Sequence, residues 1–301
     1  MSAGLGEVAA FGTACCWGIS SQVQGAVART IGSTEMTLLR MPYQTLFLTV
    51  ACLVTQVEIF LTPATFAQLL ASGVLGICFC DFMLYRAMTI IGPSMAVLLL
   101  SLSAGFTALF GWIFLDEVIP FQAIAGVVVT LAGIAWVITE HSGSTLLPGQ
   151  AIPEGKALAA GVILAACASM SLSASFIFLK QAMQSGTDPL WATFVRMLLG
   201  AAVLWGVGIF RGWARSLAAG LKANPRYYWI LFLSCICGSM GMWLSSIGMN
   251  LAPVGVAATL IGLQPVMVTI IGALWYRKRP SLRVASGILI AFAGTALVCL
   301  R

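Results

Sequence analysis

Asp81 is the one acidic residue that the sequence places deep inside a long apolar segment. A charge inside hydrocarbon costs at least about 2.5–3.5 kcal/mol on insertion scales, so such a residue needs a reason to be there. Its carboxyl group could carry a proton or anchor a substrate ammonium group. Alternatively, it is a structural partner for Arg40, Arg196 or Arg86. Arg86 follows Asp81 at a spacing that suits a pair on one helix poorly.

Arg40 and Arg196 occupy equivalent places in two similar segments, Leu39-Arg40-Met41 and Val195-Arg196-Met197. We expect these long side chains to hydrogen-bond neighbouring carbonyls or to extend to a membrane face. Binding of a substrate carboxylate is the alternative for either residue.

A stripe of polar and aromatic residues marks the first apolar segment. Thr13, Trp17, Ser20 or Ser21, and Gln24 recur at three- to four-residue spacing and therefore share one helix face. Such a face suits a water-filled cavity, although packing or an interfacial belt is the alternative for the aromatic rings. With similar residues from later segments, the predicted substrate site comprises Trp17, Ser20, Ser21, Tyr85, Trp243, Ser246 and Gln264.

Pro265 follows Gln264 within an apolar segment. Because proline lacks an N–H group, it frees the carbonyl four residues earlier, that of Ile261. Unwinding at this point would expose backbone groups to a ligand.

Motifs of the common enzymes and metal sites are missing from the sequence. It has no Gly-rich phosphate loop, no G-x-S-x-G and no H-E-x-x-H, and its single histidine is His141. Cys78 and Cys80, like Cys235 and Cys237, are two residues apart and point about 200° from each other on a helix, so neither pair can easily share an ion. We expect no catalytic residue, no metal and no cofactor.

The composition indicates that the chain lies in a lipid bilayer rather than in water. With 60% hydrophobic and 8% charged residues and a mean hydropathy of +1.02, the chain is too apolar for a soluble domain. The apolar runs are continuous over about 20 residues, which is typical of membrane-spanning helices rather than barrel strands. The sequence predicts an all-α integral membrane protein whose ten spans are 7–29, 34–56, 66–90, 92–115, 119–139, 155–180, 188–211, 225–249, 253–276 and 281–300.

The second five spans echo the first five. Gly126 and Gly133 recur as Gly287 and Gly294 within similar apolar segments, and Pro93 recurs as Pro253. We therefore divide the chain into a first five-helix repeat, a connecting loop and a second five-helix repeat, over residues 1–140, 141–154 and 155–301. Because five is odd, the repeats must have opposite orientations, an arrangement that builds a substrate site near the midplane between the halves.

The net charge of +6 does not indicate nucleic-acid binding, because the basic residues are sorted by membrane side rather than clustered. Residues 211–226 and 277–283 carry most of them, and excess Lys and Arg mark the cytoplasmic face. This distribution places both termini outside the cytoplasm.

Several motifs together resemble the EamA family of the drug/metabolite transporter superfamily. They are Cys16-Trp17-Gly18, Arg40, Tyr85-Arg-Ala87, and residues 114–126 followed by Gly133. The resemblance spans essentially the whole chain and implies export of amino acids or other small metabolites. The chain departs from the family by having Ala104-Gly105 where helix 4 usually has proline, and many relatives have cytoplasmic termini, in conflict with the charge distribution.

We therefore expect a carrier that exports small amphipathic metabolites, amino acids including aromatic ones first, by alternating access. Its cavity should be bounded by helices 1, 3, 4, 6, 8 and 9, and we expect a monomer in the lipid bilayer of a bacterial inner membrane. The alternative transport function is exchange or uptake of an organic anion or phosphorylated metabolite, which needs two basic residues at the cavity. Arg196 and residues 277–279 could supply them. A membrane-embedded enzyme or receptor is the third alternative.

Overall fold

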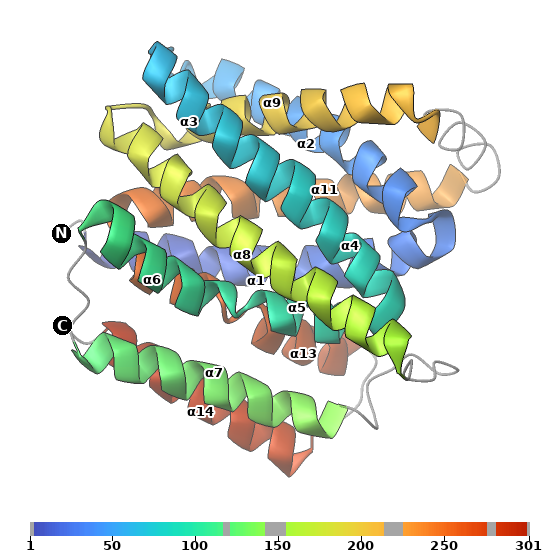
Figure 1. Cartoon of the computed structure of the whole chain (residues 1–301), viewed down its shortest axis with the longest axis vertical. Helices are drawn as coiled ribbons and strands as arrows, with labels where there is room; N and C mark the ends of the chain where they lie inside the picture. The colour runs from blue at the N-terminus through green and yellow to red at the C-terminus, as the bar shows by residue number, and fades with distance from the viewer. Residues whose placement is uncertain (1–2, 117–120, 142–154, 214–224, 276–280, 300–301) are drawn as a thin grey trace.

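The structure is a computed structural model that describes residues 3–116, 121–141, 155–213, 225–275 and 281–299. All regular secondary structure in these residues is helical, and helices that continue one another form ten rods. Figure 1 shows the rods side by side in one bundle, with both termini at the same end, as an even number of crossings requires. The all-α fold predicted from the sequence is confirmed.

The first half of the chain forms five rods. They are α1 (Ala3–Ile31), α2 (Ser33–Thr55), a continuous rod of α3 (Pro63–Gly73), η1 (Val74–Phe79) and α4 (Cys80–Ile91), a broken rod of α5 (Pro93–Leu100) and α6 (Ser103–Leu115), and α7 (Phe121–His141).

The second half repeats this pattern. Its rods are α8 (Lys156–Gln184), α9 (Pro189–Phe210), α11 (Pro225–Leu251), a broken rod of α12 (Val254–Ile261) and α13 (Gln264–Trp275), and α14 (Leu282–Cys299).

Length and composition suit these rods to a membrane. Five described helices are long and apolar enough to cross a bilayer: 33–55, 63–91, 156–184, 189–210 and 226–251. Shorter apolar helices lie in the broken rods and in α7 and α14. Large apolar side chains such as Val128, Ile163 and Leu233 are exposed on the outside of the bundle, as lipid contact requires.

Local sequence explains where two of the rods begin. Pro63 and Pro189 occupy the first turns of α3 and α9, where a missing N–H group costs nothing. The preceding residues cap the helices, since Thr62 accepts a hydrogen bond from the N–H of Thr65 and Asp188 accepts one from that of Leu190.

Contacts between α7 and α14 reveal the inverted repeat. A Cβ atom at Gly133 would lie 2.8 Å from the carbonyl oxygen of Gly287, and one at Gly294 would lie 2.7 Å from that of Gly126. Gly133 and Gly294 are repeat mates, and so are Gly287 and Gly126. Exchanging each glycine for its repeat mate therefore turns one contact into the other, as a two-fold axis requires. Residue numbers rise along one helix while they fall along the other, so the two helices are antiparallel. The chain is thus built from two inverted five-helix repeats.

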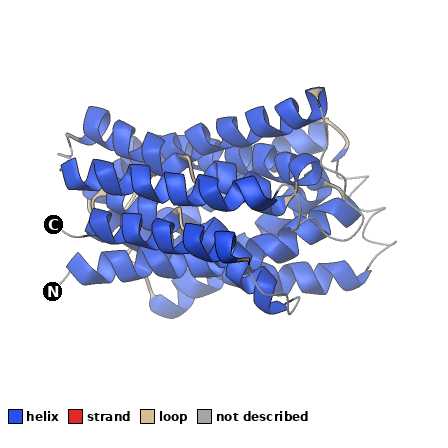
Figure 2. Cartoon of the chain, turned by 90° about the horizontal axis from the view of Figure 1, so that it is seen from below, coloured by secondary structure: helices blue, strands red, loops and turns tan. Residues whose placement is uncertain are grey.

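The two repeats interlock at the centre of the bundle. Helix α1 packs along α11, and the equivalent helix α8 packs along α3, η1 and α4. The α7–α14 pair lies along one side of the bundle in Figure 1, and Figure 2 shows the same helical bundle turned by 90°. This arrangement places α1, η1, α4 and α11 around the seam between the repeats.

Three irregularities interrupt the central rods. The expected break near Pro265 is confirmed, because α12 ends at Ile261 and α13 begins at Gln264. The equivalent rod is also broken, between Leu100 and Ser103, although it has no proline at that place. The third rod contains the π-helical turn η1, which no sequence pattern indicated; such turns are frequent at functional sites.

Candidate functional site

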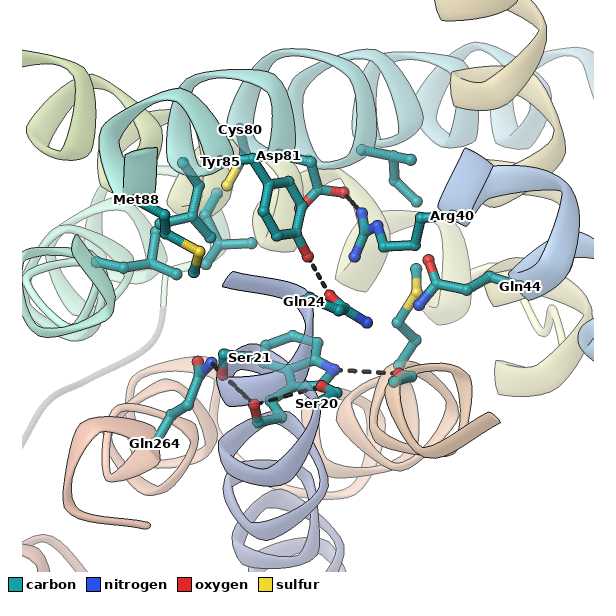
Figure 3. Close-up of a pocket in the computed structure, with 18 of the residues that line it drawn as sticks. Ser20, Ser21, Gln24, Arg40, Gln44, Cys80, Asp81, Tyr85, Met88 and Gln264 are labelled. Atoms are coloured by element: carbon teal, nitrogen blue, oxygen red, sulfur yellow. Dashed lines mark hydrogen bonds and ion pairs between the residues drawn. The ribbon is translucent and has the colours of Figure 1, made fainter. Parts of the chain in front are cut away.

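A cavity opens at the seam between the two repeats (Figure 3). It encloses about 590 Å³ of space between atoms, part of which is open to the solvent. The lining comes from both repeats: Trp17, Ser20, Ser21, Gln24, Arg40, Gln44, Gly76, Ile77, Cys80, Asp81, Leu84, Tyr85, Met88, Leu100, Leu172, Arg196, Gly238, Met242 and Gln264.

Trp17 is positioned by a flat glycine surface on α11. Its indole Nε1 donates a hydrogen bond of 3.2 Å to the carbonyl oxygen of Gly238. A Cβ atom at Gly241 would lie 2.7 Å from the same Nε1, so only glycine leaves space for the ring. The next residue, Gly18, allows α1 to approach α13, because a Cβ atom there would lie 2.7 Å from the Cβ atom of Met267. The adjacent Trp17 and Gly18 therefore place an aromatic ring at the cavity and bring two helices together.

Gln264 connects the broken ninth rod to α1. Its Nε2 donates a hydrogen bond of 2.9 Å to the Ser21 hydroxyl, and it lies 3.4 Å from the carbonyl oxygen of Trp17. Ser21 in turn donates to the same carbonyl oxygen. Because Gln264 is the first residue of α13, this contact fixes the start of that helix against the polar face of α1.

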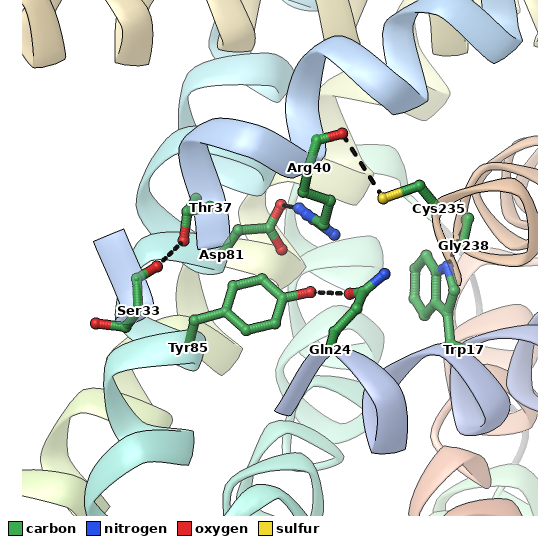
Figure 4. A network of polar contacts seen from close by, with 9 residues as sticks. All are labelled: Trp17, Gln24, Ser33, Thr37, Arg40, Asp81, Tyr85, Cys235 and Gly238. Atoms are coloured by element: carbon green, nitrogen blue, oxygen red, sulfur yellow. Dashed lines mark hydrogen bonds and ion pairs between the residues drawn. The ribbon is translucent and has the colours of Figure 1, made fainter. Parts of the chain in front are cut away.

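The acidic group of the cavity is paired. Asp81 lies in the first turn of α4, two residues after the π-helical turn, and its carboxylate accepts a hydrogen bond from Arg40 on α2 in an ion pair. The Arg40 guanidinium also lies over the Tyr85 ring, with its carbon 5.1 Å from the ring centroid. Tyr85 donates a hydrogen bond to the side-chain oxygen of Gln24 on α1. Figure 4 shows that these four side chains form one polar network between α1, α2 and α4.

Other polar atoms of the lining have no partner in the described part of the chain. Both amide atoms of Gln44 and the amide nitrogen of Gln24 are buried without a hydrogen bond, and so are Nε and Nη1 of Arg196. Buried polar groups are nearly always hydrogen-bonded in proteins, so orphaned ones need an explanation. Their concentration around one cavity indicates that a polar ligand or water completes them.

The structure brings together most of the residues proposed from the sequence. Trp17, Ser20, Ser21, Tyr85 and Gln264 line the cavity, as do the three charged candidates Asp81, Arg40 and Arg196. Because Arg40 and Arg196 reach it, helices 2 and 7 contribute to the lining as well as the expected helices 1, 3, 4, 6, 8 and 9.

Trp243 and Ser246 lie away from the cavity lining. Ser246 is fully buried, and its hydroxyl is hydrogen-bonded with that of Thr193, which joins α11 to α9. Trp243 is partly buried and packs against the apolar core. Trp243 sits on a different face of α11 from Gly238 and Met242, which do line the cavity, whereas Ser246 lies one helical turn beyond Met242, outside the lining.

Sequence reasoning missed several lining residues, among them Gln44 and Gly238. Gln44 follows Arg40 by one helical turn, and this spacing could have indicated that the two share a face. The carbonyl oxygen of Gly238 accepts from Trp17, but nothing in the sequence distinguishes this glycine from those that only serve helix packing.

Comparisons with known proteins agree with this architecture. The sequence model of the EamA-like transporter family matches residues 4–139 and 159–300. Among solved structures, 29 chains are similar. One of them, a crystal structure described only as that of a protein, has 17% sequence identity and a TM-score of 0.70, and the match covers 97% of this chain and 94% of that chain. At this identity the likeness concerns the fold alone. No curated protein matches the chain.

Proposed function

Because the chain belongs to the EamA-like transporter family, we propose that it is a carrier that moves small amphipathic metabolites outward across a bacterial inner membrane. Amino acids, aromatic ones included, are the first candidates for its substrate. The observation that carries this proposal is the cavity at the seam between the inverted repeats, where carriers of this architecture bind their substrates.

The chemistry of the cavity suits an amphipathic molecule. Leu84, Met88, Leu100, Leu172 and Met242 supply an apolar wall. The orphaned amide groups of the two glutamines and the arginine donors supply hydrogen-bonding partners for a polar head. Small-molecule sites typically combine such a mostly apolar lining with a few convergent polar groups.

The two broken rods support a mechanism of alternating access. Leu100 ends α5 and Gln264 begins α13, and both residues line the cavity. Discontinuous helices at the midplane allow one part of a repeat to move against the other around the bound substrate. The glycine contacts of the α7–α14 pair and of η1 with α9 provide smooth surfaces on which such movement can occur.

Exchange of an organic anion is the second candidate function, and one observation favours it. Two arginines, Arg40 and Arg196, reach the cavity, whereas the basic residues at 277–279 lie outside the described residues. However, Asp81 already pairs with Arg40. The cavity therefore suits one carboxylate better than the two charges of a phosphate ester.

A counterflow assay tests the proposed function. Purified protein in liposomes loaded with an unlabelled compound should accumulate the same labelled compound from outside, and a panel of amino acids, organic anions and cationic drugs should identify the class. Accumulation also rules out a pure receptor, because a receptor binds without flux. Absence of accumulation for every class, with folded protein in the membrane, would count against a carrier.

A further inference from the structure

Arg196 is a buried cation with unused hydrogen-bond donors at the wall of the cavity. The residue is 4% exposed, and neither Nε nor Nη1 of its guanidinium has a hydrogen-bond partner among the described residues. A guanidinium has five N–H donors and no acceptor, so these groups match an anion. Charged residues within membrane segments normally pair with one another or mark a substrate path.

Close helix packing directs this side chain to the cavity. Helix α9 approaches the third rod closely, because a Cβ atom at Gly200 would lie 2.7 Å from the carbonyl oxygen of Gly73. In the π-helical turn, a Cβ atom at Gly76 would lie 3.3 Å from Nη2 of Arg196. Glycine at this position therefore leaves space for the guanidinium, and both Gly76 and Arg196 line the cavity.

The charges of the lining do not balance. The charged side chains among the described lining residues are those of Arg40, Asp81 and Arg196. Asp81 forms an ion pair with Arg40 and also interacts electrostatically with Arg196. One carboxylate cannot neutralise two guanidinium groups, so one positive charge lacks a counterion within the site.

Neutral polar groups lie in the same cavity and also lack partners. A Cβ atom at Gly238 would lie 2.8 Å from Nε2 of Gln44 and 3.4 Å from Nε2 of Gln24, so both amides reach the same glycine. The side-chain oxygen of Gln44 is a free acceptor in the described structure. A ligand with an ammonium or hydroxyl group beside its anionic group could use this acceptor.

We propose that Arg196 binds the carboxylate of the substrate, and that the cavity selects small molecules with a single carboxylate. It should favour such acids, α-amino acids included, over amides and amines of the same shape and over phosphate esters. Its repeat mate Arg40 has a different role, because Asp81 occupies it. This inference rests on the proposed carrier function and names the substrate class of the same site.

Binding to purified full-length protein in detergent, measured by titration calorimetry, tests the inference. The probes are 3-phenylpropionate, its amide, 3-phenylpropylamine and phenyl phosphate, together with L-leucine and L-leucinamide. We expect each carboxylate to bind about tenfold or more tightly than the matched amide, because hydrogen bonds to charged groups are the strong ones. Equal binding of acids and amides by the unmodified protein would overturn the inference.

Variants of Arg196 assign the preference to this residue. Arg196→Gln should reduce the tenfold preference to less than about threefold, while Arg196→Lys keeps the charge and should retain part of it. Arg86→Gln is the matched control, because it removes the same charge from an exposed position on α4 and should keep the full preference. A preference that persists in folded Arg196→Gln would contradict the assignment. If that variant does not fold, Arg196→Lys is compared with Arg86→Gln. A smaller preference for carboxylates in Arg196→Lys supports the assignment, and an equal preference contradicts it.

The result is separable from the carrier function. Carboxylate binding that depends on Arg196 without counterflow in liposomes would support the anion site and contradict the carrier. Counterflow of amides and amines as rapid as that of the acids would support the carrier and contradict the anion site.

Discussion

Arg40 and Asp81 form an ion pair that joins α2 to α4 at the wall of the cavity. The carboxylate is therefore already partnered and is not a free anchor for a substrate ammonium group. The sequence limited the partner to three arginines and correctly disfavoured Arg86, whose side chain is exposed. It could not choose between Arg40 and Arg196, because both lie on other helices and only tertiary packing decides which one reaches Asp81.

Replacing Asp81 with Asn should destabilise the protein. The change keeps the shape of the side chain but leaves the Arg40 charge buried without a counterion, which costs about 3–5 kcal/mol in comparable buried pairs. We expect a clear fall in the melting temperature of the purified protein, followed by tryptophan fluorescence, and loss of both counterflow and pH-driven transport.

The double variant Arg40→Gln, Asp81→Asn should recover part of this stability, because it removes both charges of the pair. Asp116→Asn is the matched control, since Asp116 is exposed at the end of α6 and Asn tolerates its left-handed backbone (φ 52°). Loss of pH-driven accumulation with intact counterflow would instead identify Asp81 as a proton carrier. An Asn variant with normal stability and full pH-driven transport would contradict both roles.

Much of the fold could be predicted because the two halves of the sequence share a recognisable pattern of residues. The glycines at 126, 133, 287 and 294 indicated both the duplication and a close helix contact, and the structure joins them in the α7–α14 pair. The π-helical turn at Val74–Phe79 could not be predicted, because its residues are ordinary helix formers and strand formers without a proline or a glycine pair. It forms where η1 packs against α8 and α9, and such long-range packing leaves no local signal.

Gly133→Val should disrupt the α7–α14 pair. The Cβ atom alone would lie 2.8 Å from the carbonyl oxygen of Gly287, and the opposing backbone cannot move without separating the helices. Overpacking of this kind typically costs about 1–3 kcal/mol. Thermal unfolding of the purified variant should therefore begin at a lower temperature. Gly206→Val on α9 is the control, because a Cβ atom there meets nothing within 4 Å and the melting temperature should change little.

The composition of the site was only partly predictable, because helical periodicity identifies a face but not what that face contacts. The polar stripe of α1 does meet the cavity at Trp17, Ser20, Ser21 and Gln24. Ser246 has the same residue type, yet its hydroxyl joins Thr193 between two helices. A buried serine serves a cavity or a helix contact equally well, so its chemistry could not separate the two roles.

Cysteines placed at Trp17 and Tyr85 should react with water-soluble thiol reagents in protein whose native cysteines have been replaced. Both positions line the cavity, so reagent entering it reaches them, and bound substrate should slow the reaction. Mass spectrometry of the labelled protein measures the rates. Met170→Cys is the control, because Met170 is exposed near the middle of α8, where lipid would exclude a charged reagent. Labelling of the two cavity positions only by lipid-soluble reagents would show that they face a dry core or the bilayer.

Gly241→Ala should displace the Trp17 ring and weaken substrate binding. The added Cβ atom would lie 2.7 Å from the indole Nε1, so the ring must leave its hydrogen bond to Gly238 and move into the cavity. Overpacking and the lost hydrogen bond together cost about 1–3 kcal/mol.

In protein that already carries Trp17→Ala, the same glycine change should cost little, because no ring is present to be displaced. Melting temperature and counterflow rate for the two single variants and the double variant measure this coupling. Gly105→Ala is the control, because its Cβ atom would make an ordinary contact of 3.7 Å with Leu131. Equal losses from Gly241→Ala with and without the tryptophan would mean that this glycine serves helix packing and does not position the ring.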